Sequence, residues 1–207
     1  MNTLALREYK ARLQMTRRQR QILDGMMLGD GHLERQHGAL FARLKVEHCV
    51  AQAAYVAWKY SEWQTWVNVP PRIRTKRNRL GTHSANVGFT TLSHEQFEMA
   101  RQRFYRDGRK IVPADLELTA LSMAVWFMDD GSKKSRECRG LYMNTQGFAP
   151  CEVEQLQAFI SRDLSAETSL RMQADGLQIY FPSASVGTLT EYIADNLLPT
   201  MRYKLSG

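Results

Sequence analysis

The stretch "AVWFMDDGSKKS", residues 124 to 135, carries more information about this protein than any other. An almost wholly apolar helix runs here directly into two adjacent aspartates, Asp129 and Asp130, which are followed by Gly131. Carboxylates are poorly placed at the C-terminal end of a helix, where the helix dipole is negative. Something in the folded protein must therefore compensate these charges.

The same arrangement occurs earlier in the chain. "LDGMMLGDG", residues 23 to 31, is also an apolar segment that ends in Asp-Gly, with Asp30 in the place of Asp130. Gly25 and Gly29 share one face of this helix, which lets it approach a partner backbone closely. The second helix is apolar nearly all round and must be buried. We therefore expect the two helices to pack on each other, with both acids at the same end.

Two carboxylates at the negative ends of two helices repel each other unless a divalent cation lies between them. We therefore predict that Asp30 and Asp130 are metal ligands. Asp129 points about 100 degrees away around its helix, and its counterpart in the first segment is Gly29, so Asp130 is preferred. A single Asp-Gly helix end is more often an ordinary solvated terminus with a glycine cap. Two Asp-Gly helix ends in matching positions favour the interpretation that the aspartates are metal ligands.

The elements around these helices also occur twice in the same order. Thr16 and Gln19 form a capping-box pattern at the start of the first helix, and Gly31 is expected to be its left-handed C-cap. Each copy reads as helix, strand, helix, two-stranded hairpin and closing helix. The expected ranges are 16–29, 41–49, 53–66, 73–79 with 85–92, and 94–105, then 117–130, 140–148, 151–164, 167–173 with 177–183, and 187–198. We predict an α+β chain of two pseudo-symmetric halves, residues 1–112 and 113–207.

The composition favours a polyanionic partner. The 207 residues include 28 lysines and arginines against 21 acids, which gives a formal charge of +7. The three cysteines show no CxxC spacing, so neither a disulfide framework nor a zinc site is expected, and a reducing compartment is favoured. No apolar run reaches the roughly 20 residues that span a bilayer, and no signal peptide is apparent, so no membrane partner is expected.

"RIRTKRNR", residues 72 to 79, holds five cations and no acid. Alternation places Arg72, Arg74 and Lys76 on one strand face and Arg77 and Arg79 on the other. A two-stranded ribbon fits the DNA major groove, so we predict a double-stranded DNA partner. Further predicted DNA-binding residues are Arg43, Lys45, Lys133, Lys134, Arg136, Arg139, Arg171 and Gln173. Trp58, Trp63 and Trp66 are expected in a core, and the five scattered histidines are not expected to be ligands.

The two acid-ended segments resemble the paired motifs of the LAGLIDADG homing endonucleases, in the branch that carries both motifs in one chain. "LDGMMLGDGHLER" resembles the first motif and "LSMAVWFMDDGSK" the second, and "MNTQGF" and "MRYKL" extend the likeness over about residues 16–205. The resemblance implies two αββαββα-like halves, motif helices packed at their interface, and antiparallel sheets that form a DNA-binding saddle. It adds one element to each half, within 31–46 and 131–145.

The resemblance implies a site-specific double-strand DNA endonuclease that hydrolyses phosphodiester bonds with a divalent metal, for which Mg²⁺ is the expected ion. The catalytic residues would be Asp30, Asp130, Lys110 and Lys204; each lysine follows the closing helix of its half at similar spacing. The active unit is expected to be a monomer. Two alternatives stay open: an intron RNA maturase that assists splicing, and a catalytically idle DNA-binding regulator.

Overall fold

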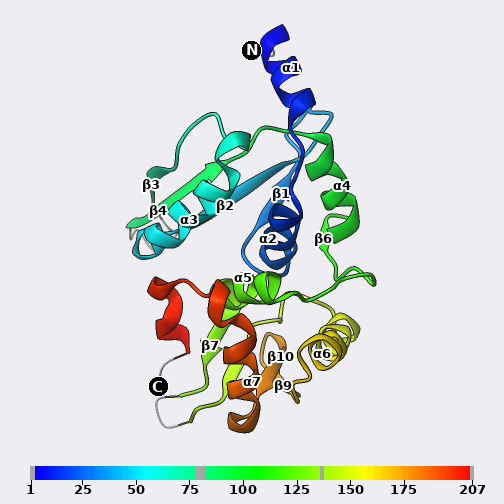
Figure 1. Cartoon of the computed structure of the whole chain (residues 1–207), viewed down its shortest axis with the longest axis vertical. Helices are drawn as coiled ribbons and strands as arrows, with labels where there is room; N and C mark the ends of the chain where they lie inside the picture. Colours follow the sequence, from blue (N-terminus) through cyan, green and yellow to red (C-terminus); the bar gives the residue numbers. More distant parts are fainter. Residues whose placement is uncertain (1–2, 78–82, 136–137, 206–207) are drawn as a thin grey trace. The chain divides into compact units, whose positions relative to one another are not determined.

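The computed structural model describes residues 3–77, 83–135 and 138–205. The chain forms two compact units (Figure 1): unit 1 is Met1–Arg20 with Gly31–Gln102, and unit 2 is Gln21–Asp30 with Arg103–Gly207. The expected boundary between residues 112 and 113 stays a prediction about the sequence repeat, because a repeat and a packing unit need not coincide.

Unit 1 contains an antiparallel sheet of four strands in the order β1-β2-β4-β3. Its strands are β1 (His32–Glu34), β2 (Arg43–Cys49), β3 (Arg72–Arg77) and β4 (His83–Thr90). Its helices are α1 (Leu4–Arg12), α3 (Ala53–Trp63), most of α4 (Glu95–Phe104), and the 3₁₀ turns η1 (Val50–Gln52) and η2 (Gln64–Trp66). Helix α3 packs on β2 and β4, which leaves the other face of the sheet for polar side chains.

Aromatic rings fill the core of unit 1. Trp63 and Trp66 are almost completely buried, and their ring centroids lie 5.6 and 5.1 Å from that of Phe97. Trp58 is half-buried and stacks on Tyr55. The expectation that these tryptophans serve packing is confirmed for Trp63 and Trp66.

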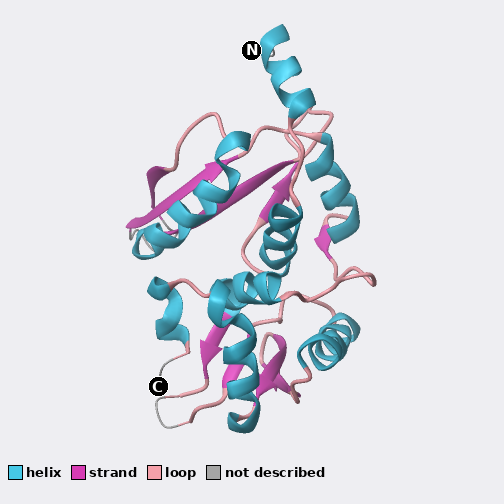
Figure 2. Cartoon of the chain, in the orientation of Figure 1, coloured by secondary structure: helices cyan, strands magenta, loops and turns pink. Residues whose placement is uncertain are grey.

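Unit 2 contains a second antiparallel sheet, in the equivalent order β7-β8-β10-β9 (Figure 2, magenta). Its strands are β7 (Gly131–Lys133), β8 (Leu141–Met143), β9 (Ser169–Gln173) and β10 (Gly176–Phe181). Its helices are α5 (Ala120–Asp130), α6 (Pro150–Leu164), α7 (Ser183–Ile193), η3 (Ala194–Asn196) and η4 (Pro199–Lys204). The shared strand order and the antiparallel pairing confirm the predicted α+β class and its duplication.

The first motif helix is α2 (Arg17–Leu28). Its predicted capping box is confirmed: Gln19 N donates to Thr16 Oγ1 at 3.1 Å, and Thr16 N donates to Gln19 Oε1 at 3.0 Å. Its residues from Gln21 onward belong to unit 2. A two-residue hairpin, β5 (Tyr105–Arg106) with β6 (Arg109–Lys110), leads from α4 toward α5.

The expected left-handed cap at Gly31 is wrong. Within the described ranges the glycines with positive φ are Gly38, Gly108 and Gly176. Gly131, the counterpart of Gly31, has φ −66° and ψ 140° and opens β7 directly. A Cβ there would lie 2.5 Å from Phe127 Cε2, so close packing rather than chain reversal requires this glycine. The chain leaves each motif helix into a strand, as β1 and β7 show, within the ranges where the resemblance adds an element.

Other differences concern the ends of elements. Helix α5 begins at Ala120 rather than at residue 117, because the side chain of Thr119 accepts a hydrogen bond from Ser122 N and so caps the helix. Helix α1 has no buried residue and so no apolar face that periodicity could reveal. Among the residues that the structure describes, no helix is both long and apolar enough to cross a membrane.

Candidate active site at the ends of the motif helices

Helices α2 and α5 pack through glycine. A Cβ added to Gly25 would collide with the carbonyl oxygen of Ser122 and lie 2.8 Å from Val125 Cβ. A Cβ added to Gly29 would lie 2.5 Å from Asp129 Cβ. The backbones approach so closely that both positions admit only hydrogen. The expectation that the two apolar helices pack on each other is confirmed.

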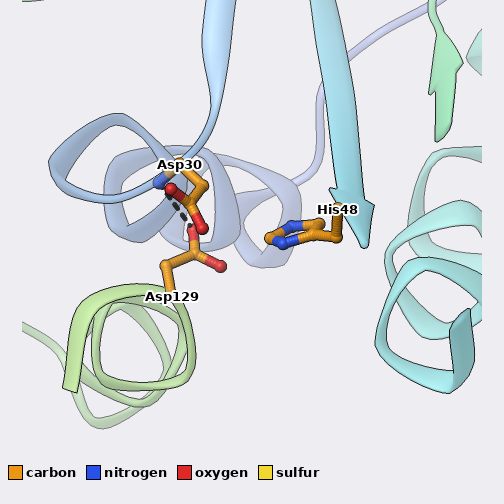
Figure 3. A group of neighbouring side chains, drawn as sticks. All are labelled: Asp30, His48 and Asp129. Carbon is orange, nitrogen blue, oxygen red and sulfur yellow. Dashed lines mark hydrogen bonds between the residues drawn. The ribbon is translucent and has the colours of Figure 1, made fainter. Parts of the chain in front are cut away.

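The carboxylates of Asp30 and Asp129 lie next to each other at the C-terminal end of this helix pair (Figure 3). Asp129 Oδ2 accepts a hydrogen bond from the backbone N–H of Asp30 at 3.1 Å. Their carboxylate oxygens lie within 4.8 Å of each other. Asp30 is exposed, whereas Asp129 is 8% exposed. His48, also drawn, belongs to unit 1, where its Nε2 lies 2.9 Å from Lys59 Nζ.

Asp130 is half-buried and lies in a field of negative charge. Burial, and then the neighbouring carboxylates of Asp129 and Asp30, raise the pKa of Asp130 to about 8, although Lys110 and Lys204 act in the opposite direction. Ionising Asp130 beside the other two carboxylates is therefore unfavourable in the protein alone. A bound cation would relieve this repulsion, and carboxylate oxygens are the ligands that hard divalent ions prefer.

The two predicted lysines reach the ends of the two motif helices. Lys110, on β6, donates from Nζ to the carbonyl oxygen of Gly29 at 2.5 Å. Lys204, at the end of η4, donates from Nζ to the carbonyl oxygens of Met128 and Asp129 at 2.6 and 2.8 Å. These carbonyls lie at helix C-termini and need donors, since the helix itself supplies none. Unit 2 thus gathers all four predicted catalytic residues at one place.

One contributor to this site was missed from the sequence. Asn144 donates from both its backbone N and its Nδ2 to the carbonyl oxygen of Asp130, at 3.1 and 2.7 Å. Its Oδ1 accepts from Gln178 Nε2 on β10 at 2.6 Å. Asn144 lies in the segment "MNTQGF", whose likeness to the family was the available signal.

The polar face of the unit 1 sheet carries several of the predicted DNA-binding residues. Arg72 pairs with Gly88, and Gly88 pairs with Glu47, so these residues share one face. Alternate residues share a face, which adds Arg74 and Lys45. Arg72 and Arg74 are exposed on the edge strand β3. Arg43 and Lys45 lie half-buried beside acids: Arg43 pairs with Glu34 and Lys45 with Glu47.

The predicted DNA-binding residues of unit 2 form a different set. Arg171 and Gln173 lie on the edge strand β9, and Lys134 and Arg139 lie in the segment between β7 and β8. The Arg171 guanidinium lies 5.3 Å from the Tyr180 ring centroid, and Lys134 Nζ lies 5.2 Å from the same centroid. Arg171, Gln173, Lys134 and Arg139 are exposed.

Some of the predicted DNA-binding residues lie on a covered face, and others lie outside the residues that the structure describes. Lys133 is half-buried and pairs with Leu141, whose side chain is buried, so it lies on the covered face of its sheet. Arg79 and Arg136 lie outside the described residues. For Lys76 and Arg77 only the strand pairing with Ser84 and His83 is described.

Two helices that pack through glycine and end in carboxylates, in a chain whose antiparallel sheets carry exposed arginines, fit the DNA endonuclease that the motifs predict. The profile of the LAGLIDADG DNA endonuclease family matches residues 20–189, and the chain belongs to that family. Members of this family of homing endonucleases cleave DNA, so the protein is a DNA-cleaving enzyme. The resemblance inferred from the motifs is confirmed.

The relatives include endonucleases and maturases. A probable intron-encoded endonuclease 1 from Wickerhamomyces canadensis is 27% identical over 99% of this chain and 91% of its own length. The cytochrome b mRNA maturase bI2 of Debaryomyces hansenii is 26% identical over 89% of this chain and 72% of its own length. The RecA protein of Mycobacterium gastri is 30% identical over 89% of this chain, which spans 46% of that protein.

Solved structures share the fold. The homing endonuclease I-WcaI bound to its DNA recognition sequence has a TM-score of 0.93 and 26% identity, covering 99% of this chain and 93% of that chain. DUF199/WhiA from Thermatoga maritima has a TM-score of 0.55 at 12% identity, covering 95% of this chain and 62% of that chain. At 12% identity, the likeness to DUF199/WhiA shows a shared fold and nothing about function.

Proposed function

We propose that this protein is a site-specific homing endonuclease that binds double-stranded DNA and hydrolyses one phosphodiester bond in each strand at the ends of α2 and α5. The observation that carries this proposal is the gathering of Asp30 and Asp130 with two lysines, where burial, and then the carboxylates of Asp129 and Asp30, raise the pKa of Asp130 to about 8. Such clusters are typical of functional sites rather than of stabilising ones.

Asp30 and Asp130 hold the divalent metal in this proposal, and Mg²⁺ is the ion that their oxygen ligands suit. Homing endonucleases of this family use divalent metals. A bound divalent ion supplies Lewis-acid activation of water and of the scissile phosphate. The protein supplies a fixed pair of helix ends, so that the two carboxylates are in place before DNA arrives.

Lys110 and Lys204 stabilise the negative charge that develops on the phosphate. The carbonyl oxygens of Gly29, Met128 and Asp129 hold the two ammonium groups at the helix ends, so little reorganisation is needed during the reaction. A cation that is already oriented contributes more to the rate than one that must be ordered in the transition state.

The edge strands β3 and β9 read the DNA. Arginines on a two-stranded ribbon can pair with guanine or hold phosphates in the major groove. The two strands differ, with Arg72 and Arg74 on β3 but Arg171 and Gln173 on β9, so the two halves of the target need not be related by symmetry. Since both motif helices lie in one chain, the active unit is a monomer.

A second candidate function is assistance of intron splicing, with host intron RNA as partner. Maturases from Debaryomyces hansenii and Saccharomyces cerevisiae are among the relatives, at 26% and 27% identity. The cleavage function is preferred because a splicing factor has no need of two acids and two lysines gathered at one point.

The deciding experiment incubates the purified protein with Mg²⁺ and a plasmid library that carries random target sites. A defined double-strand cut that disappears with EDTA supports the proposal. Absence of any cut over the library, together with tight binding of the RNA of the intron that encodes the chain, would replace it with the maturase.

A further inference from the structure

We propose that Asp129 is a positioning residue: its buried carboxylate fixes the backbone of Asp30 from across the helix pair and so sets the direction of the Asp30 side chain. This inference rests on the proposed function, because it concerns how one of the two acids is held in place. It gives a role to the first aspartate of the "MDDG" sequence, which is not one of the four proposed catalytic residues.

The two acids are held by different means. Helix α5 continues through Asp130, so the helix itself sets the backbone of that residue. Helix α2 ends at Leu28, and Asp30 lies beyond it. The Asp30 N–H donates to Asp129 Oδ2 at 3.1 Å. A contact from the other helix therefore provides an anchor where the regular helix has already ended.

Gly29 makes this contact possible. A Cβ at residue 29 would lie 2.5 Å from Asp129 Cβ and 2.7 Å from its Oδ2. Gly29 and Asp129 occupy equivalent places in the two motifs, one without a side chain and the other with a carboxylate that fills the vacated space. The glycine of the first motif thus leaves the space that the aspartate side chain of the second motif occupies.

Asp129 is itself held firmly. Asp129 is only 8% exposed, and its carbonyl oxygen accepts a hydrogen bond from Lys204 Nζ at 2.8 Å. One residue therefore contacts the first acid through its carboxylate and a catalytic lysine through its backbone. A hydrogen bond from an N–H to a carboxylate is stronger than one between neutral groups, and a buried carboxylate needs such donors.

Two substitutions separate positioning from metal ligation. Asp129→Asn keeps an oxygen that can accept the Asp30 N–H but is a poor ligand for a hard divalent ion. Asp129→Ala removes both properties. If Asp129 positions Asp30, the Asn variant stays within about 10-fold of wild-type activity, the scale of one weakened contact, and the Ala variant does not. If Asp129 is instead a metal ligand, both variants lose this function.

The experiment measures three quantities for wild type, both Asp129 variants, Asp30→Asn and Leu121→Ala: amide hydrogen exchange at Asp30 without metal, Mn²⁺ affinity without DNA, and the single-turnover cleavage rate of each DNA strand. Leu121 is buried in α5 far from the acids along the helix, so Leu121→Ala controls for lost stability. A misplacement of about 1 Å lowers a rate by roughly 10²-fold.

We expect Asp129→Asn to keep slow exchange at the Asp30 amide and to retain Mn²⁺ affinity and cleavage rates within about 10-fold of wild type, the scale of one weakened contact. Asp129→Ala should exchange faster at Asp30 and should cut the two strands at unequal rates, because Asp30 moves and Asp130 does not.

Equal loss of Mn²⁺ affinity in Asp129→Asn and Asp30→Asn would overturn the proposal in favour of a metal ligand. Identical behaviour of Asp129→Ala and Leu121→Ala would reduce Asp129 to a packing residue. If the wild type cuts no DNA, the proposed function fails, but the exchange rate at Asp30 still decides whether Asp129 anchors its backbone.

Discussion

Lys110 donates a hydrogen bond from its Nζ to the carbonyl oxygen of Gly29 at 2.5 Å. Gly29 directly precedes Asp30, so this lysine is tied to the backbone that carries the first acid. Lys204 bears the same relationship to Asp129, which directly precedes Asp130, at 2.8 Å. Each acid therefore has its own lysine, held by the peptide unit just before it. The repeat seen in the sequence is preserved in the hydrogen bonding of the site.

Replacing either lysine by methionine should slow cleavage. We expect Lys110→Met and Lys204→Met each to lower the single-turnover rate by roughly 10²–10³, the scale for losing one electrostatic contact in the transition state. DNA affinity, measured in parallel with Ca²⁺ in place of Mg²⁺, should change little. A large loss of affinity with normal cleavage of the bound DNA would instead make these lysines phosphate clamps.

Enlarging Gly25 should destabilise the helix pair. Gly25→Ala places a methyl group against the Ser122 carbonyl, and overpacking of this kind costs about 1–3 kcal/mol. Gly187→Ala in α7 is the matched control, because it would meet no atom within 4 Å. The control should raise stability by about 0.4–1 kcal/mol, since alanine restricts the unfolded chain. Urea unfolding measures both, and equal effects would contradict the close approach of α2 and α5.

Binding to the target DNA should depend steeply on salt. If about 6–10 phosphates are contacted, affinity should fall by roughly 10³–10⁵ between about 50 and 200 mM salt. Arg72→Ala combined with Arg74→Ala should lower this slope, whereas Arg12→Ala on the exposed face of α1 should not. Fluorescence anisotropy over a salt series measures the slope, and a flat response would refute the basic strands as the DNA-binding surface.

One protein chain should bind one target site. Sedimentation of the complex with a duplex that carries a single site should give one protein chain per duplex, since both acid-ended helices come from the same chain. Substitutions in the two halves of the site should be tolerated differently, because β3 and β9 carry different side chains. A ratio of two chains per site, or cleavage restricted to palindromes, would contradict the pairing of Asp30 with Asp130 within one molecule.

The elements that could be predicted from the sequence are those whose side-chain pattern repeats over several turns or strand residues. Helix α5 is apolar over most of its length, and β2 alternates buried with half-buried residues from Arg43 to His48. Strands β1 and β7 have three residues each, too few for alternation to be recognised, and only the likeness to a family indicated an element there.

The gathering of the acids could be predicted because two Asp-Gly helix ends occur in the same register. The contacts that orient them could not. Which carboxylate oxygen meets the Asp30 N–H depends on where α2 ends and on how closely Gly29 approaches α5, and both are set by tertiary packing. The hydrogen bonds from Asn144 to Asp130 could not be predicted either, because they require the end of β8 to lie beside the end of α5.

The most direct test of the central claim is double-strand cleavage of the target by Asp30→Asn and Asp130→Asn in Mg²⁺, with DNA affinity measured on the same preparations. A neutral amide is a poor ligand for a hard divalent ion. The predicted result is loss of cleavage in both variants, with affinity for DNA within about 10-fold of wild type, a change of about 1.4 kcal/mol. Substantial cutting by either variant at ordinary Mg²⁺ concentration would contradict the assignment of these two aspartates as the metal-binding catalytic pair.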